Sequence, residues 1–398
     1  MTLKEAGVCL IDCDHKTPTA QETGFPYVAI PQLKNGRIDF TDARRISHEN
    51  LKIWTRKAKP QEDDVVLSRR CNPGETAYVP PNEEFAVGQN LVLLRSDGKN
   101  LFPPFLRWLV RSPGWWEQIQ KYLNAGAVFD SLKCADIPNF ELTIPDFSTQ
   151  RRITEILSAL DEKIELNRQT NATLEAIAQA IFKEWFIDFR FPGTTGEMQY
   201  SELGLIPKGW RVFELGELID SVSVTHCFEK REVIFLNTSD IEAGKVLTHN
   251  FSPVEGLPGQ AKKSIKKFDI LFTEIRPGNK RFALIDFDAE DYVVSTKLMV
   301  LRTKADIPPI VVYNFLTSNE ILNWLQHLAE SRSGTFPQIT FDQVRTLKVA
   351  LHRDLAVKYS SLAWGNFQRV KSTEQEDANL TALRDYLLPR LMNGEIEV

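Results

Sequence analysis

Several polar and reactive side chains lie close enough in this sequence to suggest a catalytic or metal-binding site. Cys9, Cys13 and His15 could bind a metal ion, but a fourth ligand at a suitable spacing is missing, so buried or incidental cysteines are the simpler interpretation. His226 and Cys227 are adjacent, and a nucleophile–base pair would need an unusual turn there. The phosphate-loop, zinc-protease and adenine-methylation motifs are also missing. The sequence therefore predicts no catalytic residue and no metal site.

A cationic loop in the second half of the chain carries side chains of the kind that contact nucleic acids. It reads Arg276-Pro-Gly-Asn279-Lys280-Arg281 and follows the predicted strand Ile270–Thr273. Three cations, an asparagine and a glycine within six residues suit contacts to phosphates or hydrogen bonds to base edges. The alternative is an ordinary solvated turn. A similar loop follows a strand in the first half and contains Arg69, Arg70 and Asn72.

The composition indicates a globular protein with more than one domain. A chain of 398 residues exceeds one ordinary core, and 42% hydrophobic and 25% charged residues are globular values. No apolar run reaches the ~18 residues that a membrane span needs, and no signal peptide opens the chain. Five cysteines without a CxxC motif indicate reduced thiols in the cytoplasm. Because the net charge is −5, contacts to nucleic acid would depend on local patches or on partner subunits.

One long helix is predicted in the middle of the chain, after Thr149. Its seam repeats with alternating spacings of four and three residues and contains neither glycine nor proline, as in a coiled coil. Forty-odd helical residues would extend over roughly 60 Å. The seam consists of Ile153, Leu157, Leu160, Ile164, Asn167, Asn171, Leu174, Ala178, Ile181 and Trp185.

The chain contains one unit twice, with an offset of 205–208 residues. Asp64-Val65-Val66 matches Asp269-Ile270-Leu271, and Leu91–Arg95 matches Leu298–Arg302. The offset also places the long helix on the C-terminal segment and so predicts a second helix. The apolar matches between the two helices are Ile156 with Leu362, Leu157 with Ala363, Ile164 with Val370, Leu174 with Leu380, Ile177 with Leu383, Ile181 with Leu387, Phe182 with Leu388 and Trp185 with Leu391.

The repeat divides the chain into five segments. We expect an α+β domain at 1–147, a helix at 148–191, a linker at 192–208, a second α+β domain at 209–352 and a second helix at 353–398. Domain one would contain strands at Phe25–Ile30, Val65–Ser68 and Leu91–Leu94, and a helix over Phe105–Asn124 that is broken near Ser112.

The connectivity predicts an antiparallel helix pair with an internal pseudo-twofold axis. The second helix can bury its seam only by running back along the first, so the two domains would lie at opposite ends of the pair. Each helix has a polar middle, with Asn167, Arg168 and Asn171 in one and three acidic residues, Glu374, Glu376 and Asp377, in the other. These middles would either pair and set the register or remain solvated. The predicted interface residues of the second helix are Val370, Leu380, Leu387 and Leu391.

An object with two similar heads and a pseudo-dyad suits double-stranded DNA, in which half-sites are read one helical turn or a small multiple apart. Four stretches then make the chain resemble the specificity subunit of a type I DNA restriction-modification system. They are the long helix from Ile153, GLIPKGWRVFELGEL from Gly204, LNTSDIEAGKV from Leu236 and LRDYLLPRLMNGEI from Leu383. With the repeat, the resemblance covers the whole chain.

The resemblance implies two target-recognition domains that together read a bipartite, asymmetric DNA site. It also implies a complex with two methyltransferase subunits, which would use S-adenosylmethionine, and optionally with a restriction subunit that would use ATP and Mg²⁺. The specificity subunit itself would hold no cofactor and perform no chemistry. A second pair of loops, 126–133 and 331–338, resembles the Gly-rich loop of these domains, which either presents backbone amides or only shapes the domain. Its candidate DNA contacts are Lys133, Arg332, Thr335 and Gln338.

Two other classes of function remain as alternatives. The chain could be a coiled-coil scaffold that assembles partner proteins without reading DNA. It could also be a DNA-modifying enzyme that acts alone, although the missing catalytic motifs argue against this.

Overall fold

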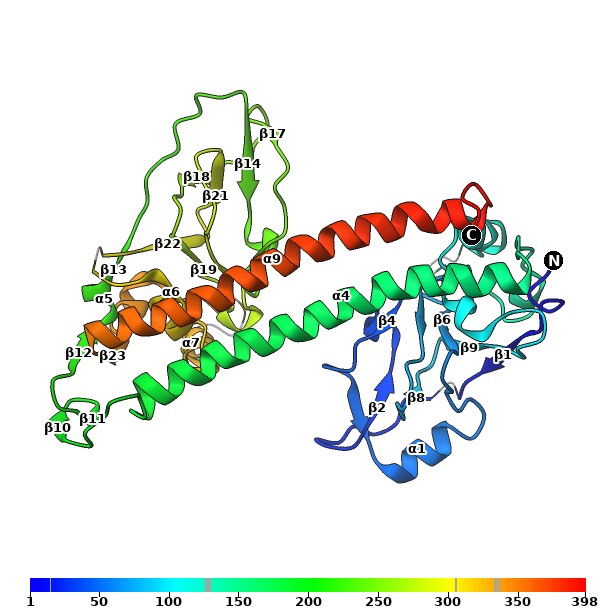
Figure 1. Cartoon of the computed structure of the whole chain (residues 1–398), viewed down its shortest axis with the longest axis horizontal. Helices are drawn as coiled ribbons and strands as arrows, with labels where there is room; N and C mark the ends of the chain where they lie inside the picture. The colour runs from blue at the N-terminus through cyan, green and yellow to red at the C-terminus, as the bar shows by residue number, and fades with distance from the viewer. Residues whose placement is uncertain (15, 126–129, 305, 333–334, 336) are drawn as a thin grey trace. The chain divides into compact units, whose positions relative to one another are not determined.

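The computed structural model describes residues 1–398 except 15, 126–129, 305, 333–334 and 336. The chain folds as two compact units. Unit 1 contains Met1–Asn167 and Gln375–Val398, and unit 2 contains Arg168–Glu374. Each unit therefore combines one domain with part of each of two long helices, α4 (Phe147–Phe182) and α9 (Arg353–Met392) (Figure 1).

Unit 1 is built on a four-stranded antiparallel sheet in the order β1-β9-β6-β7. These strands are β1 (Val8–Asp12), β9 (Leu91–Ser96), β6 (Val65–Ser68) and β7 (Thr76–Tyr78). A second sheet has the order β5-β2-β8, with β5 (Arg44–Ile46), β2 (Phe25–Val28) and β8 (Ala86–Val87), and β3 (Leu33–Lys34) pairs with β4 (Arg37–Ile38). The predicted strand over Phe25–Ile30 ends early, because Ile30–Gln32 forms a 3₁₀ turn with Pro31 at its start.

Short helices cover the main sheet of unit 1. They are α2 (Leu106–Leu109) and α3 (Pro113–Tyr122), with Ser112 capping α3, and this is the predicted break in the helix. The remaining helical elements are α1 (His48–Trp54) and the 3₁₀ turns Pro103–Phe105 and Ile137–Asn139. The core joins strand residues such as Val65 and Leu94 to Leu157 of α4 and Leu391 of α9, so the helix pair completes the domain.

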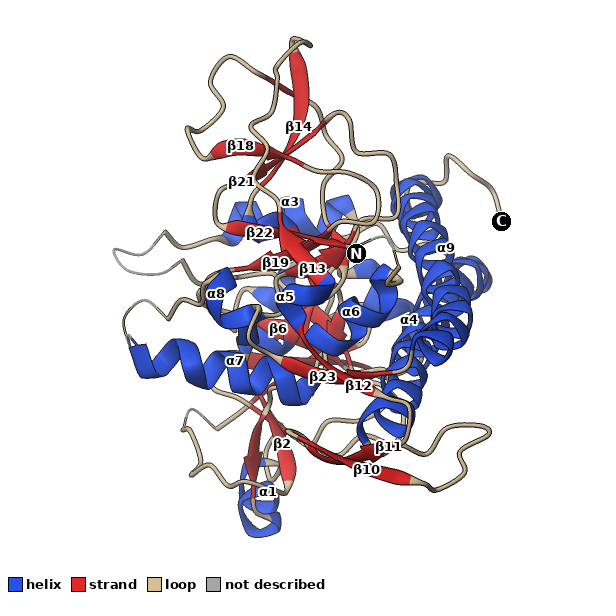
Figure 2. Ribbon diagram, turned by 90° about the vertical axis from the view of Figure 1, so that its left-hand side faces the viewer, coloured by secondary structure: helices blue, strands red, loops and turns tan. Residues whose placement is uncertain are grey.

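Unit 2 repeats the main sheet in the order β13-β22-β19-β20. These strands are β13 (Ile219–Ser221), β22 (Leu298–Thr303), β19 (Ile270–Thr273) and β20 (Phe282–Leu284). A second sheet has the order β17-β14-β21-β18, with β17 (Ser252–Pro253), β14 (Glu232–Leu236), β21 (Tyr292–Ser295) and β18 (Ala261–Ser264) (Figure 2). Two small ribbons pair β15 (Ile241–Glu242) with β16 (Lys245–Val246) and β12 (Arg211–Glu214) with β23 (Lys348–Leu351).

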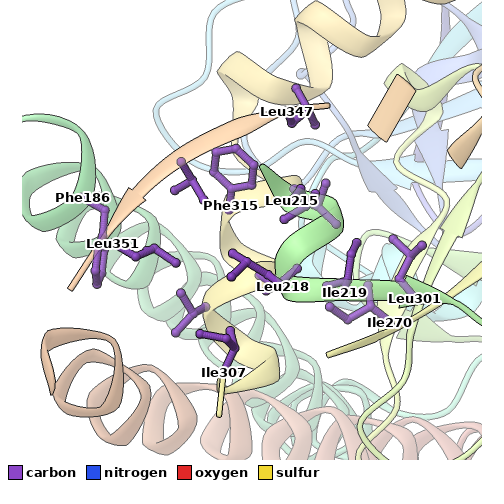
Figure 3. Close-up of a cluster of buried hydrophobic side chains, with 14 of the residues drawn as sticks. Phe186, Leu215, Leu218, Ile219, Ile270, Leu301, Ile307, Phe315, Leu347 and Leu351 are labelled. Carbon is purple, nitrogen blue, oxygen red and sulfur yellow. The ribbon is translucent and has the colours of Figure 1, made fainter. Parts of the chain in front are cut away.

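The core of unit 2 lies between the main sheet and its helices. These are α5 (Leu215–Leu218), α6 (Pro309–Leu316), α7 (Asn319–Arg332) and α8 (Phe341–Val344), with 3₁₀ turns at Thr238–Asp240 and Pro277–Asn279. Figure 3 shows Leu215, Leu218 and Ile219 gathered with Phe315 of α6 and Ile270 of β19. Because α4 adds Phe182 and Phe186 to the same cluster, the helix pair completes this domain too.

An ion pair between a buried aspartate and a partly exposed arginine occurs at the same place in both domains. Arg95 binds Asp64 through two hydrogen bonds of 2.7 Å, and Arg302 binds Asp269 at 2.7 and 2.8 Å. Both carboxylates are 1% exposed. Each pair ties the strand before the cationic loop (β6 or β19) to its central neighbour (β9 or β22), which supports the repeat at the level of single contacts.

The first long helix begins and ends for local reasons. Asp146 accepts hydrogen bonds from the amides of Ser148 and Thr149 at 2.9 and 3.1 Å, which caps α4. The hydroxyls of the same two residues also donate to Asp146, and these bonds, more than those of the amides, lower the pKa of that carboxyl. The α-helix ends at Phe182 and continues as a π-helical turn over Lys183–Ile187, so the prediction of helix to residue 191 was wrong at its end. The turn places Phe186 against Trp210 and Tyr359, with ring centroids 5.7 and 5.5 Å apart.

The C-terminal helix and the linker also differ in part from the prediction. Helix α9 stops at Met392 and includes Pro389, so residues 393–398 are not helical. The segment predicted as a linker contains a β-hairpin of β10 (Met198–Ser201) and β11 (Gly204–Pro207). The turn residues and prolines there do favour a loop, but the intervening residues still pair across a tight turn. Among the described helices, none is long and apolar enough to cross a membrane.

Candidate nucleic-acid interface

The loop between β19 and β20 presents the predicted cations of unit 2. Arg276 and Lys280 both have a left-handed backbone, with φ of 45° and 54°, on either side of the 3₁₀ turn Pro277–Asn279. Such backbone is costly for residues other than glycine and persists where surrounding contacts hold it. Here the Gly278 amide donates to Oε1 of Gln326 in α7 at 2.9 Å. Arg276, Asn279 and Lys280 are exposed on this fixed turn.

The structure joins this loop to the second predicted loop of the same domain. Ile275 forms a β-bridge with Gln338, and the Arg276 amide donates to the Pro337 carbonyl at 3.1 Å. The Ile339 amide donates to the Glu274 carbonyl at 2.8 Å. Gln338 is half-buried beside this bridge, and Thr335 is exposed. Arg332 is the last residue of α7, while positions 333–334 and 336 of the predicted loop lie outside the described residues.

Arg281 differs from the other cations of the loop because its side chain is tied to its own domain. Its guanidinium donates to the Ile241 carbonyl at 3.0 Å and lies 3.6 Å from the Glu242 carboxylate. These contacts fix the ribbon β15–β16 beside β20. In the sequence, Arg276, Lys280 and Arg281 look alike, whereas in the structure the side chain of Arg281 is bonded to its own domain.

The corresponding loops of unit 1 meet in the same way. Arg70 forms a β-bridge with Ser131, and the Leu132 amide donates to the Arg69 carbonyl at 2.9 Å. Arg70 and Asn72 are exposed, as is Lys133 beyond the bridge. The part of this predicted loop at 126–129 lies outside the described residues.

Arg69 has a buried donor that its own domain does not use. Its Nε atom is buried and has no hydrogen-bond partner within the part of the chain that the structure describes. A buried guanidinium donor without a partner is destabilising, so it marks a place where an anionic acceptor from outside would be favourable. The side chain as a whole is half-buried.

Both domains thus bring their two predicted loops together at one bridge. The bridging residues, Arg70 with Ser131 and Ile275 with Gln338, are related by the offset of the repeat. The backbone frame is shared, while the side chains on it differ. Over the described residues, no three His, Cys, Asp or Glu side chains gather in a way that could hold a metal ion, and His15 lies outside the description.

The predicted seam of the helix pair is enclosed to different degrees along its length. In unit 2, Ile181 and Trp185 pack against the domain core, and in unit 1 Leu387 does the same. The buried seam residues are Ile153, Leu157, Asn167, Asn171, Ala178, Val370 and Leu391. The half-buried ones are Leu160, Ile164, Leu174, Ile181, Trp185, Leu380 and Leu387.

The helices run antiparallel in each unit, and their polar middles form contacts. In unit 1, the Asn167 amide nitrogen donates to Glu376 at 2.9 Å and to Asp377 at 2.7 Å. In unit 2, the Thr373 hydroxyl donates to Asn171. Residue numbers rise along α4 while those of its partners fall along α9, and Figure 1 shows α9 alongside α4 within each unit. Asn167 and Asn171 are buried, whereas Arg168 is exposed and the Glu376 side chain is 43% exposed, so the asparagines are enclosed and the charged side chains keep contact with solvent.

Unit 1 contains a buried charge cluster that was not predicted. Asp161 of α4 accepts from Arg37 of β4 and Arg384 of α9, both at 2.8 Å, and lies 3.6 Å from Arg107 of α2. Burial alone would raise the pKa of Asp161, but the three guanidinium groups outweigh it and hold this pKa below its usual range. The cluster ties the domain to both helices. In the sequence, only Asp161 and Arg384 among the apolar residues of the two helices could have indicated this cluster.

Four apolar residues matched by the repeat lie on the outside of the helix pair. Ile156 and Leu383 are 37% and 45% exposed in unit 1, and Ile177 and Leu362 are 43% and 51% exposed in unit 2. Lys163 of α4 lies 3.5 Å from Glu376 of α9. Ile156 lies seven residues before Lys163, and Leu383 lies seven residues after Glu376. Because the helices are antiparallel, both steps lead in the same direction along the pair. Both residues therefore lie on one edge of the pair. None of these four residues belongs to the predicted seam.

These features define a class of protein, one built from a duplicated α+β domain and a pair of long helices. Two copies of one α+β domain present different polar loops on the same frame, and an antiparallel helix pair completes both cores. A family model described as "Type I restriction modification DNA specificity domain" matches the chain twice, over residues 7–176 and 207–351. The chain belongs to this family.

Individual relatives agree with this assignment. The specificity subunit of the type I restriction enzyme HindI from Haemophilus influenzae is 47% identical over 142 residues, which are 35% of this chain and 31% of that protein. The match thus spans about a third of that relative. The specificity subunit of the type I restriction enzyme MjaIX from Methanocaldococcus jannaschii is 24% identical over 334 residues, 79% of this chain and 75% of that protein.

A solved structure shows the same fold. The crystal structure of a type I restriction-modification S subunit from M. genitalium superposes with a TM-score of 0.54 at 14% identity, covering 98% of this chain and 95% of that one. This confirms the predicted fold class of two similar α+β domains with a pair of long helices.

Proposed function

We propose that this chain reads a bipartite, asymmetric DNA site for a type I restriction-modification complex and positions the methyltransferase subunits on it. The observation that carries the proposal is the loop junction found in both domains. Each junction exposes cations and an asparagine on a repeated frame, at Arg70 and Asn72 in unit 1 and at Arg276 and Asn279 in unit 2. Cations contact phosphates, and arginine and asparagine can each form paired hydrogen bonds to base edges.

The different side chains at the two junctions support two specificities. Unit 2 offers a 3₁₀ turn with two left-handed residues, whereas unit 1 offers Cys71 at φ 65° and Gly74 at φ 97°. Loops on one frame but with different geometry would read different half-sites, which makes the whole site asymmetric. Family membership favours this reading over a scaffold that ignores DNA sequence.

Methylation mapping tests the proposal. The chain would be produced with its methyltransferase subunit in a host that lacks other methyltransferases, and methylated bases would be mapped across the genome. We expect methylation confined to one two-part motif. Exchanging residues 209–352 for the same segment of a relative with another specificity should change one half of the motif only. Scattered methylation, or none in an assembled complex, would contradict the proposal.

The partners follow from the same assignment and from the outer edge of the helix pair. We propose that two methyltransferase subunits dock there, one at Ile156 and Leu383 and one at Ile177 and Leu362. Exposed apolar residues that recur in a repeat mark contact surfaces, because water-exposed groups of this kind gain free energy when a partner covers them. A restriction subunit that uses ATP and Mg²⁺ would join the complex through these partners.

We further propose that the chain performs no chemistry itself, since specificity subunits of this family are generally non-catalytic. S-adenosylmethionine would be bound by the partner subunits. The isolated chain, incubated with DNA and labelled methyl donor and then with Mg²⁺, should transfer no label and cut no DNA. Turnover that is proportional to the amount of purified chain would overturn this assignment.

A further inference from the structure

Unit 2 contains a cavity that DNA reading does not require. It has a volume of about 490 Å³ and lies where α6 and the loop after β19 face the helix pair. This volume is within the range of small-molecule sites, which are mostly apolar with a few polar groups. Six of the residues that line it are Glu175, Lys280, Phe282, Tyr313, Thr317 and Phe367.

Unit 1 has large charged side chains at the equivalent place. A Cβ atom on Gly36 would lie 3.1 Å from the Arg111 guanidinium, whereas one on the repeat-related Gly244 would lie 2.7 Å from the Tyr313 hydroxyl. Arg107 also lies over the Tyr78 ring at 4.5 Å and close to Asp161. Arginines and their buried aspartate thus occupy this junction in unit 1, while unit 2 has a cavity.

Three aromatic rings form an apolar wall of the cavity. Phe282 and Tyr313 are 6.0 Å apart, and Tyr313 and Phe367 are 6.2 Å apart, both edge-to-face at 78°. The Tyr313 hydroxyl makes no hydrogen bond within the described residues, and burial raises its pKa, so it stays a neutral donor. Such a wall suits the flat face of a ring and attracts a cation through the electron-rich ring faces.

One carboxylate that lines the cavity, Glu175, forms no direct ion pair within the described residues, although lysines lie near it. Lys245 and Lys371 pair with Glu374 at 3.2 and 3.1 Å, and Lys371 also donates to the Gly244 carbonyl at 2.8 Å. Glu175, at the mouth of the cavity, forms no ion pair or hydrogen bond with any residue that the structure describes. Glu175 is exposed. The protein atoms around it still exclude part of its water, and this desolvation, followed by the charge of Glu374, raises the pKa of Glu175, although Lys245, Lys371 and Lys280 act in the opposite direction. A ligand that brings a positive charge would stabilise this carboxylate.

We propose that the cavity binds a small organic cation, namely a primary amine carried on an aromatic body. The ring would lie against Phe282, Tyr313 and Phe367, and the ammonium group would face Glu175. Because Lys280 belongs both to the cavity wall and to the loop Arg276–Arg281, the ligand would contact the base of that loop. This inference goes beyond the DNA-reading function and does not depend on it.

Three indole compounds of similar size test the charge that the cavity selects. Tryptamine, tryptophol and indole-3-acetate would be titrated calorimetrically into the isolated full-length chain without DNA. We expect tryptamine to bind at least tenfold more tightly than tryptophol, and indole-3-acetate to bind most weakly. Equal affinities, a preference for indole-3-acetate, or no binding by any of the three would overturn the proposal.

Substitutions in the cavity locate the binding site. Glu175→Gln should lower the affinity for tryptamine about tenfold and leave that for tryptophol unchanged. Thr317→Trp should abolish binding of both, because the new ring occupies the cavity. Glu155→Gln, an exposed glutamate of α4 outside the cavity, is the matched control and should change neither. If Glu155→Gln weakened tryptamine as much as Glu175→Gln, the attraction would be a general charge effect and the assigned site would be wrong. DNA binding, measured separately, reports on the proposed function alone.

Discussion

At the scale of residues, Arg276 and Arg281 in one loop differ in what their guanidinium groups contact. Arg276 is exposed and forms no side-chain hydrogen bond within the described residues, whereas Arg281 is bonded to the Ile241 carbonyl. We expect Arg276→Ala to weaken DNA binding by about 1–3 kcal/mol, as a lost base or phosphate contact does. Arg281→Ala should instead lower the stability of the chain and change the salt dependence of DNA binding little. Fluorescence anisotropy over a range of salt concentrations, with urea unfolding of both variants, measures the two effects. The opposite pattern would reverse the roles assigned to these arginines.

Arg69 and Arg95 offer a second matched pair, in unit 1. Arg69 has a buried Nε without a partner among the described residues, and Arg95 is bonded to the buried Asp64. Arg69→Met should therefore leave the free energy of unfolding within about 1 kcal/mol of the original, while Arg95→Met should lower it by about 2 kcal/mol because Asp64 loses its partner. For DNA affinity we expect the reverse order, with the larger loss in Arg69→Met. If Arg69→Met cost as much stability as Arg95→Met, the buried donor would have a partner within the fold.

At the scale of elements, the charge cluster around Asp161 ties α4, α9 and the domain of unit 1 together. The folded state lowers the pKa of Asp161, so its stabilising effect is complete above the ordinary aspartate value of about 4 and is lost as the pH falls through the lowered pKa. Asp161→Asn should reduce the free energy of unfolding by about 3 kcal/mol at pH 7, because three arginines lose their partner.

The same substitution should matter less in acid. Below pH 4 the unfolded chain takes up a proton at Asp161 while the folded chain still keeps this carboxylate ionised, so the difference between the two proteins should shrink as the pH falls towards the lowered pKa. Urea unfolding at pH 7 and at pH 3.5 measures it, with the exposed neighbour Glu162→Gln as the control for a change in net charge. A difference that stayed constant between the two pH values would show that packing, rather than the ion pairs, is what the substitution disturbs.

Sequence patterns predicted the elements better than the faces they present. The heptad spacing and the offset of the repeat were sufficient for both helices and for the strands next to the cationic loops. The heptad seam already leaves out Ile156 and Ile177, and the structure shows them 37% and 43% exposed, but their apolar identity alone could not show whether a partner or solvent covers them. The hairpin at 198–207 was missed because its turn residues also favour a linker. The role of Arg281 depends on Ile241, forty residues away, which local spacing does not reveal.

At the scale of the whole molecule, the two copies of the repeat agree in their frame and differ where each domain meets the helices. Each unit has the same main sheet, the same Asp–Arg pair and the same bridge between its two loops. The junction with the helices differs, since unit 1 has the Asp161 cluster and unit 2 has the cavity. The two units thus share the frame that carries the candidate DNA-contacting loops, while the loops themselves and the junctions with the helices differ.

The repeat also predicts how many partners the chain binds and where. Ile156 and Leu383 are exposed apolar residues of unit 1, and the residues that the repeat relates to them, Leu362 and Ile177, are exposed in unit 2. We expect Ile156→Ser with Leu383→Ser to leave a complex with one methyltransferase subunit, Ile177→Ser with Leu362→Ser to do the same, and all four substitutions to leave none. Because the altered side chains are already exposed, the fold should be little affected. Native mass spectrometry of the co-expressed complexes gives the stoichiometry directly.

Leu166→Ser, at another exposed apolar position of α4, is the control and should leave both subunits bound. Loss of both subunits from a variant altered at one site would contradict two independent sites, and full occupancy of the fourfold variant would place the partners elsewhere.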